Sequence, residues 1–307
     1  MESEKPVREI QSVLAGIERD DALYEEANFG GRLQALDALE VSVLDPLEDL
    51  VAANGQAGAL GALKRRAEMA RSRLEATDEG LFRRLRAGIR SGALRGAELK
   101  RRLEAYAGCG RGKRCQNGGA YDSLDALIGG ILLSGAAPGE TAGRESEMVF
   151  YQPTPGRIIF ELVERANFQK DDTLYDLGSG LGHVVILAHL LSGVTAKGVE
   201  VDPGYCEYAT RCARELNLSG VEFVHTDARA ANYAGGTAFF LYTPFEGKML
   251  QDVLDRLRGV AQKRRIDVYT YGPCTVDVSR QDWLEPVGPD AGGMHSLAAF
   301  RSLKGER

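Results

Sequence analysis

A glycine-rich turn that directly follows an acidic residue is the part of this chain whose residue types most clearly suit ligand chemistry. It lies in the run Leu174-Tyr-Asp-Leu-Gly-Ser-Gly-Leu-Gly-His-Val-Val185, where a β-type run ends at Asp176 and an apolar helix pattern follows. The loop between them consists mainly of small residues, Gly178, Ser179, Gly180 and Gly182. Glycine permits a tight turn and lets the backbone approach a ligand without a Cβ clash, and the following helix offers free N–H groups. A carboxylate so close to the loop would repel a phosphate but would suit a ligand that carries an ammonium group.

Two further acids follow strand-like runs in the same part of the chain. The run Lys197-Gly-Val-Glu-Val-Asp-Pro203 carries Glu200, and the run Val221-Glu-Phe-Val-His-Thr-Asp227 ends in Asp227. In open α/β sheets, ligands bind beyond the carboxyl ends of the strands, so acids at three successive strand ends define one candidate site. Asp202 fits the position of a helix cap better than Glu200 does.

The elements needed to position these acids alternate along the chain from about residue 147. The expected strands are Thr173–Leu177, Ala196–Val201, Glu222–His225, Ala238–Tyr242, Ile266–Tyr271 and His295–Ser302. Helical patterns lie between them at Ile158–Ala166, His183–Leu191, Gly204–Leu216 and Lys248–Arg258. This alternation predicts a mostly parallel, doubly wound α/β sheet with helices on both faces. We expect the last run to form the closing edge strand.

The order of these motifs resembles that of the class I S-adenosylmethionine-dependent methyltransferases from Tyr151 to about Leu303. A dinucleotide-binding fold is the alternative for a glycine loop, but it would show G-x-G-x-x-G, whereas this loop reads G-x-G-x-G. The resemblance implies a Rossmann-like methyltransferase sheet with S-adenosyl-L-methionine as cofactor, held by Asp176 and the glycine loop. It also implies that Glu200 holds both ribose hydroxyls and that Asp227 accepts a hydrogen bond from the adenine amino group.

Two neighbouring runs carry a closer resemblance. They are Tyr151-Gln-Pro-Thr-Pro-Gly-Arg-Ile-Ile-Phe-Glu-Leu-Val163 and Asp171-Asp-Thr-Leu-Tyr-Asp-Leu-Gly-Ser-Gly-Leu-Gly-His-Val-Val185. Together they are similar to the catalytic core of the non-SET histone-lysine methyltransferases, the disruptor-of-telomeric-silencing family. That family has a Tyr-x-x-Thr on a loop that closes over the methionine end of the cofactor, which implies that Tyr151 and Thr154 are cofactor contacts. The alternative for Thr154 is to cap a helix that starts near Pro155.

The region after the expected fourth strand departs from that family. The family has two asparagines followed by Phe-x-Phe, whereas this chain reads Phe240-Leu-Tyr-Thr-Pro-Phe-Glu-Gly247. Tyr242 and Thr243 offer hydroxyl or main-chain oxygens, and Phe245 adds an aromatic ring that could face a cationic methyl donor. These three residues are the candidate catalytic residues. The favoured function is N-methylation of a lysine-type protein side chain. The alternatives are a nucleic-acid or small-molecule acceptor, or a non-catalytic binding module on the same fold.

The chain before this region is expected to be helical. Apolar residues recur at helical spacing, as in the stripe Ile10, Val13, Leu14 and Ile17. We expect a helical accessory domain over residues 1–135, a linker rich in small residues over 136–150, and the S-adenosylmethionine-binding domain over 151–307.

The composition fits a globular protein, with 307 residues, 44% hydrophobic and 27% charged, and excludes a disordered or collagen-like chain. Charge is unevenly distributed, since residues 1–63 carry 4 basic and 13 acidic side chains, whereas residues 64–114 carry 16 and 6. The basic segment 64–114 could bind nucleic acid. Alternatively, it forms solvated helix faces that pair in part with the acidic first segment.

The cysteines and the apolar runs indicate the cellular compartment in which the protein is expected. Five cysteines without a CxxC pair predict reduced thiols, and four histidines that are not spaced to complete a site with Cys109 and Cys115 predict no metal. No apolar run approaches the roughly 18 residues of a membrane span, and the first residues lack a secretory signal. We expect a cytoplasmic protein with no membrane partner.

Overall fold

The computed structural model describes residues 4–54, 58–108, 122–132, 135–141, 143, 145–288 and 295–303. The chain forms two compact units, which are described separately here. The first comprises Met1–Leu85, Arg102–Gln116 and Asp122–Leu127, and the second comprises Arg86–Arg101, Asn117–Tyr121 and Ile128–Arg307. The boundaries expected at residues 135 and 151 stay a prediction. The segment that contains Cys109 and Cys115 lies outside the described residues.

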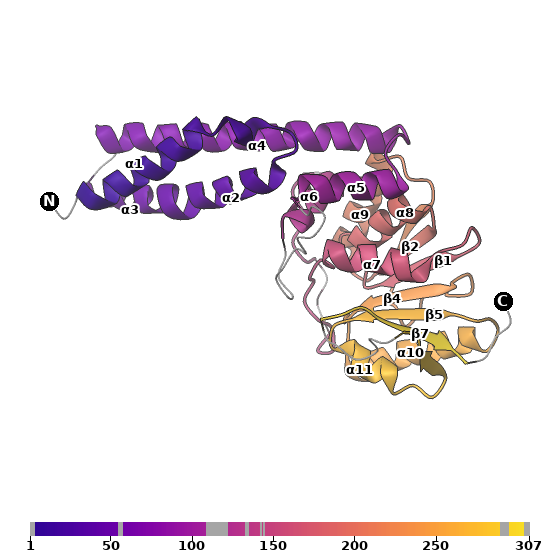
Figure 1. Cartoon of the computed structure of the whole chain (residues 1–307). Coiled ribbons are helices and arrows are strands. Elements are labelled where there is room, and N and C mark those ends of the chain that lie inside the picture. The colour runs from indigo at the N-terminus through magenta and orange to yellow at the C-terminus, as the bar shows by residue number, and fades with distance from the viewer. Residues whose placement is uncertain are drawn as a thin grey trace. The chain divides into compact units, whose positions relative to one another are not determined.

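The first unit is helical, as expected. Its elements are α1 (Glu4–Arg19), the 3-10 helix η1 (Asp21–Tyr24), α2 (Phe29–Leu39), the π-helix η2 (Glu40–Leu44), α3 (Asp45–Asn54) and most of α4 (Ala59–Arg90). In Figure 1, α1, α2 and α3 run beside the first part of α4. Their shared core contains the fully buried residues Leu14, Leu39, Leu47 and Leu74. Apolar side chains at helical spacing therefore do build this core.

A buried ion pair lies within this helical unit. Arg32 on α2 is fully buried, and its Nε lies 2.5 Å from Oδ1 of Asp78 on α4. The same guanidinium donates hydrogen bonds to the carbonyls of Leu23 and Glu25. Burial raises the pKa of Asp78 in spite of the neighbouring cation. Arg32 therefore ties α2, α4 and the loop around η1 together.

The basic side chains on α4 pair with the acidic first segment. Among the described residues, such ion pairs include Lys64–Glu48, Arg66–Glu18, Arg71–Glu40 and Arg84–Glu26. All are at least partly exposed, so each contributes at most about 1 kcal/mol to stability. These pairs are consistent with the interpretation that the basic segment forms solvated helix faces.

The second unit is built on a seven-stranded sheet. Its strands are β1 (Thr173–Leu177), β2 (Thr195–Glu200), β3 (Val221–His225), β4 (Ala238–Tyr242), β5 (Asp267–Tyr271), β6 (Leu284–Pro286) and β7 (Ala298–Ser302). They lie in the order β3-β2-β1-β4-β5-β7-β6, and only β7 pairs antiparallel, with β5 and β6. The chain order reverses between β1 and β4, which is where ligands bind in such sheets.

Helices cover both faces of this sheet. They are α7 (Gly156–Ala166), α8 (His183–Ser192), α9 (Pro203–Glu215), α10 (Gly247–Ala261) and the short α11 (Cys274–Ser279). In Figure 1, α7, α8 and α9 lie on one face, and α10 and α11 lie on the other. The helices α5 (Gly96–Tyr106) and α6 (Ser123–Leu132) each contribute residues to both units. The mostly parallel sheet with helices on both faces and the helical N-terminal region are both confirmed.

The end of the chain differs from the prediction. The run His295–Ser302 was expected to be the closing edge strand, but the strand begins at Ala298 and lies between β5 and β6. The edge strand is the three-residue β6, which escapes a sequence search because it is too short for a period-two pattern and ends in Pro286. The other strand ends agree with the prediction to within one residue.

Replacing Arg32 with Met is expected to lower the free energy of unfolding by about 3 kcal/mol, because it leaves Asp78 buried without its cation. Chemical denaturation measures the loss. The control Arg66→Met breaks the exposed pair with Glu18 and should cost less than about 1 kcal/mol. Equal losses in the two variants would show that burial adds nothing to the Arg32–Asp78 interaction.

Candidate active site

The carboxyl ends of the parallel strands open onto a pocket of about 540 Å³. Most of the residues predicted for the site line it: Tyr151, Thr154, Asp176, Gly178, Ser179, Glu200, Asp227, Tyr242, Thr243 and Phe245. The other two predicted residues, Gly180 and Gly182, do not line the pocket. They belong to the loop behind it and determine its backbone conformation. The topology therefore brings the candidate residues of four strand ends into one place.

Gly180 and Gly182 allow aromatic rings to pack directly on the loop. Gly180 has a φ of +52°, and a Cβ there would lie 2.1 Å from the ring of Tyr151. Gly182 has a φ of +87°, and a Cβ there would lie 2.5 Å from the ring of Phe223. Both the left-handed backbone and the close rings exclude other residues at these positions.

Glu200 organises the loop with its carboxylate. One oxygen accepts a hydrogen bond from the backbone N–H of Gly180 at 2.7 Å, and the other accepts one from Asp202 N–H at 2.8 Å. Burial raises the pKa of Glu200, and these two hydrogen bonds oppose the increase by favouring the charged form. The loop N–H of Gly180 is thus already directed at a carboxylate and is not open to a phosphate.

Asp176 and Ser179 lie in the pocket wall without a partner. The Asp176 side chain is buried, and no hydrogen-bond donor in the described part of the chain reaches it. Burial, together with the nearby Glu200, raises its pKa to about 8. The buried Ser179 hydroxyl likewise has no hydrogen-bond partner among the described residues. Two unsatisfied polar groups beside a glycine loop fit the ammonium and carboxylate of a bound amino-acid group.

Asp227 lies in the pocket wall within an ion-pair network. Its carboxylate accepts hydrogen bonds from the backbone N–H, Nε and Nη2 of Arg229, which also binds Glu145. The Arg229 side chain accordingly holds the pKa of Asp227 below its ordinary value. Asp202 caps α9 by accepting from Tyr205 N–H at 3.0 Å, as its sequence position predicted.

Tyr151 is anchored by a histidine at the start of α8. Its hydroxyl lies 3.1 Å from Nδ1 of His183, and its ring packs against Tyr205 with centroids 5.3 Å apart. Burial lowers the pKa of His183 to about 4, so the imidazole is neutral at physiological pH. Thr154 lines the pocket and does not cap the next helix, because Pro155 is the N-cap of α7.

The side of the pocket at the ends of β4 and β5, where a methyl acceptor would enter, is aromatic. The rings of Tyr242 and Tyr271 lie 4.8 Å apart between centroids, and the Tyr242 hydroxyl donates to Gln152 Oε1 at 3.2 Å. The Thr243 hydroxyl donates a hydrogen bond to the Tyr271 carbonyl and accepts one from Cys274 N–H. It is therefore not directed at a substrate in the pocket. These two bonds hold Thr243 at a φ of +38°, a strained value for a β-branched residue.

Three further side chains near this wall have different roles. Phe245 is buried, lines the pocket and belongs to the hydrophobic core below it. Tyr269 is buried and does not line the pocket, so its ring packs inside the domain. Cys274 is also buried, and burial raises the pKa of its thiol, so it packs as a neutral group.

The charges on the pocket wall are unbalanced. It contains five acids, Glu140, Asp176, Glu200, Asp202 and Asp227, and no Lys or Arg among the described residues that line it. Such a wall attracts cations and repels phosphates. In the described ranges, no group of three or more His, Cys, Asp or Glu residues could hold a metal ion. No helix in those ranges is long and apolar enough to cross a membrane.

Comparisons with known proteins agree with this geometry. Residues 146–234 match the family model described as histone methylation protein DOT1. No curated protein matches the chain. Similar solved structures include an RNA methyltransferase from Salinibacter ruber in complex with S-adenosyl-L-homocysteine, which is 26% identical over 49% of this chain and 92% of that one (TM-score 0.39). Another is the putative methyltransferase yhhF from Escherichia coli, which is 15% identical over 54% of this chain and 95% of that one (TM-score 0.41).

Together with the sheet order and the acids at its strand ends, the match over residues 146–234 supports a class I S-adenosylmethionine-dependent methyltransferase related to the DOT1 histone methylation proteins. The pocket fits S-adenosyl-L-methionine as the cofactor, which Asp176, Ser179 and Glu200 would hold.

Sequence reasoning missed several residues of the site. Arg229 binds both Asp227 and Glu145, and Gln152 binds Tyr242. Tyr205 packs on Tyr151. The contacts of Glu145, Gln152 and Tyr205 could not be predicted from a local pattern, because each depends on where residues 145–152 pass relative to the sheet.

Binding of the cofactor at about pH 6.5 is expected to release close to one proton, because Asp176 is protonated in the free protein and its carboxylate is favoured by an ammonium. Affinity should therefore fall, by at most about tenfold per pH unit, as pH drops below about 8. Calorimetry in buffers of different ionisation enthalpy measures the release. Asp176→Asn should bind at least about tenfold more weakly and lose it. Wild-type binding with no proton release would contradict this assignment.

Gly180→Ala should weaken cofactor binding by about tenfold or more, because the new Cβ displaces the Tyr151 ring from the loop. Gly193→Ala is the matched control, since Gly193 has a φ of +77° but nothing within 4 Å of its Cβ position. Both variants should lose roughly 1 kcal/mol of stability through backbone strain. Calorimetric titration and thermal unfolding separate the two effects, and equal affinities would argue against the Tyr151 contact.

Proposed function

We propose that this methyltransferase acts on the nitrogen of a lysine-type protein side chain. The observation that carries the proposal is the combination of an acidic, cation-free cofactor side with an aromatic acceptor side formed by Tyr242, Phe245 and Tyr271. The match to the DOT1 histone methylation model supports the same acceptor class. The predicted cofactor contacts and catalytic residues are part of this proposal.

The residues of this chain divide the work between two sides of the pocket. When bound, S-adenosyl-L-methionine supplies a methyl group on a sulfonium, which a nucleophile can displace in line. Asp176 would hold the amino group of the donor, and Glu200 and Asp227 would hold its adenosine part. Tyr151, whose hydroxyl lies against His183, would cover the methionine end. These contacts act by orientation and by exclusion of water.

The acceptor side favours an amine in its reactive form. A lysine amine must be neutral to act as a nucleophile, and burial among rings lowers its pKa. Because the Thr243 hydroxyl is engaged with Tyr271 and Cys274, the oxygens open to an amine there are the Tyr242 hydroxyl and main-chain carbonyls. Tyr242 replaces the side-chain amide of the related family in this role.

A nucleic-acid acceptor is less well supported. Several basic residues of α4, among them Lys64, Arg66 and Arg71, are paired with acids of the first segment, and the acidic pocket wall disfavours phosphate. A binding module without catalysis stays an alternative because the asparagines after the fourth strand are absent.

The test is a transfer assay with labelled donor and a lysate, separated into protein, nucleic acid and small molecules. Label should enter protein and remain on lysine after hydrolysis. Glu200→Ala should lose at least about tenfold of the rate, because the loop loses its carboxylate anchor, whereas Glu207→Ala on the exposed face of α9 should keep it. Label confined to nucleic acid or to metabolites would overturn the acceptor, and binding without transfer would favour the binding module.

A further inference from the structure

Residues 145–152, called the strap below, pass over the carboxyl ends of the strands. Five consecutive residues of the strap line the pocket: Met148, Val149, Phe150, Tyr151 and Gln152. Met148 forms an isolated antiparallel bridge with Phe245, and Val149 N–H donates to the Pro244 carbonyl at 3.2 Å. The strap therefore closes one side of the pocket and contacts the segment after β4 that carries the candidate catalytic residues.

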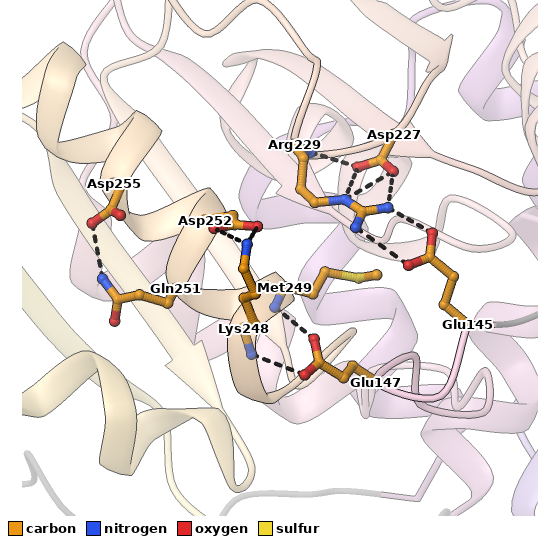
Figure 2. Close-up of polar contacts among 9 residues, drawn as sticks. All are labelled: Glu145, Glu147, Asp227, Arg229, Lys248, Met249, Gln251, Asp252 and Asp255. Carbon is orange, nitrogen blue, oxygen red and sulfur yellow. Dashed lines mark hydrogen bonds and ion pairs between the residues drawn. The ribbon is translucent and has the colours of Figure 1, made fainter.

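The strap is fixed to the amino end of α10 through Glu147. The Glu147 carboxylate accepts hydrogen bonds from the backbone N–H groups of Lys248 at 3.1 Å and Met249 at 2.7 Å (Figure 2). These are free donors of a helix start, where an acid is also favoured by the helix dipole. This anchor joins the strap to a rigid helix.

The start of the strap is held differently, by a side-chain ion pair. Figure 2 shows Arg229 between two carboxylates, Asp227 on one side and Glu145 on the other. Its Nη2 lies 2.6 Å from Glu145 Oε1 and 2.6 Å from Asp227 Oδ2, and its Nη1 lies 3.3 Å from Glu145 Oε2. One guanidinium thus links the strap to the pocket acid at the end of β3.

The two sides of this bridge differ in exposure. The side chains of Arg229 and Asp227 are each 31% exposed, whereas that of Glu145 is 55% exposed. The Asp227 side is reinforced by the backbone N–H of Arg229 at 2.7 Å. The Glu145 side has only side-chain bonds and is open to solvent, so it is the weaker of the two. The strap is thus expected to separate first at Glu145.

We propose that Arg229 is a positioning residue that latches the strap over the pocket, and that breakage of the Glu145–Arg229 ion pair is a step in the release of bound ligand. The inference rests on the proposed function, because it takes the pocket to be the cofactor site. The latch involves the Asp227 carboxylate through Arg229. A ligand that hydrogen-bonds to Asp227 acts on this same carboxylate. Latch and ligand are therefore coupled, and each changes the stability of the other by the same factor.

Stopped-flow displacement of S-adenosylhomocysteine from the full-length chain tests the latch. Glu145→Gln should raise the dissociation rate constant by about three- to tenfold without lowering the association rate constant. The double variant Glu145→Gln/Arg229→Gln should dissociate no faster than Arg229→Gln alone. In the wild type, dissociation should accelerate as ionic strength rises from about 0.05 to about 0.5 M, and this dependence should be weaker in Glu145→Gln.

The chain offers a closely matched control. The pair Lys197–Glu222 is 2.7 Å long with side chains 30% and 58% exposed, against 2.6 Å, 31% and 55% for Arg229–Glu145. Glu222 does not line the pocket, so Glu222→Gln should leave dissociation unchanged. Equal dissociation rates in the wild type and Glu145→Gln, or equal acceleration in Glu222→Gln, would overturn the latch alone. A wild type that binds neither the donor nor S-adenosylhomocysteine would overturn the proposed function as well.

Discussion

A carboxyl group buried at the end of the central strand, without a donor to satisfy it, is the constraint on which this site depends. Asp176 lies where the chain order of the sheet reverses, next to Glu200. Removing an acid from water is unfavourable unless a charge or a hydrogen bond compensates for it. The fold keeps this group in the wall of a pocket, where the ammonium of a bound ligand would favour its carboxylate form.

The same constraint changes the role of the glycine loop. In a phosphate-binding loop the backbone N–H groups face the ligand. Here the N–H of Gly180 faces Glu200, and Tyr151 covers the loop from the other side. The loop therefore contacts the Glu200 carboxylate through Gly180 and the Tyr151 ring through its outer side. The motifs G-x-G-x-x-G and G-x-G-x-G, which differ by one residue between glycines, thus go with different ligand chemistries on the same kind of sheet.

The sequence allowed the sheet and most of the pocket wall to be predicted, for local reasons. The strand β4 is strongly apolar, β1 runs directly into the glycine loop, and β2 ends in Glu200, so the ends of these strands could be placed closely. The strand β6 and the helix α11 are too short to show a period. The Glu145–Arg229 pair joins residues far apart in sequence, and only the path of the strap brings them together. The hydroxyl of Thr243 was equally unpredictable, because its direction follows from a left-handed backbone at a threonine.

Phe245 belongs both to the pocket wall and to the hydrophobic core. A substitution at this position that reshaped the cavity for a different acceptor would also remove apolar contacts from under β4 and α10. Tyr242 is only partly buried and does not have such a second role in the core. Divergence of acceptor preference among relatives of this protein should accordingly proceed through Tyr242 before Phe245, whose replacement would require compensating changes in the interior.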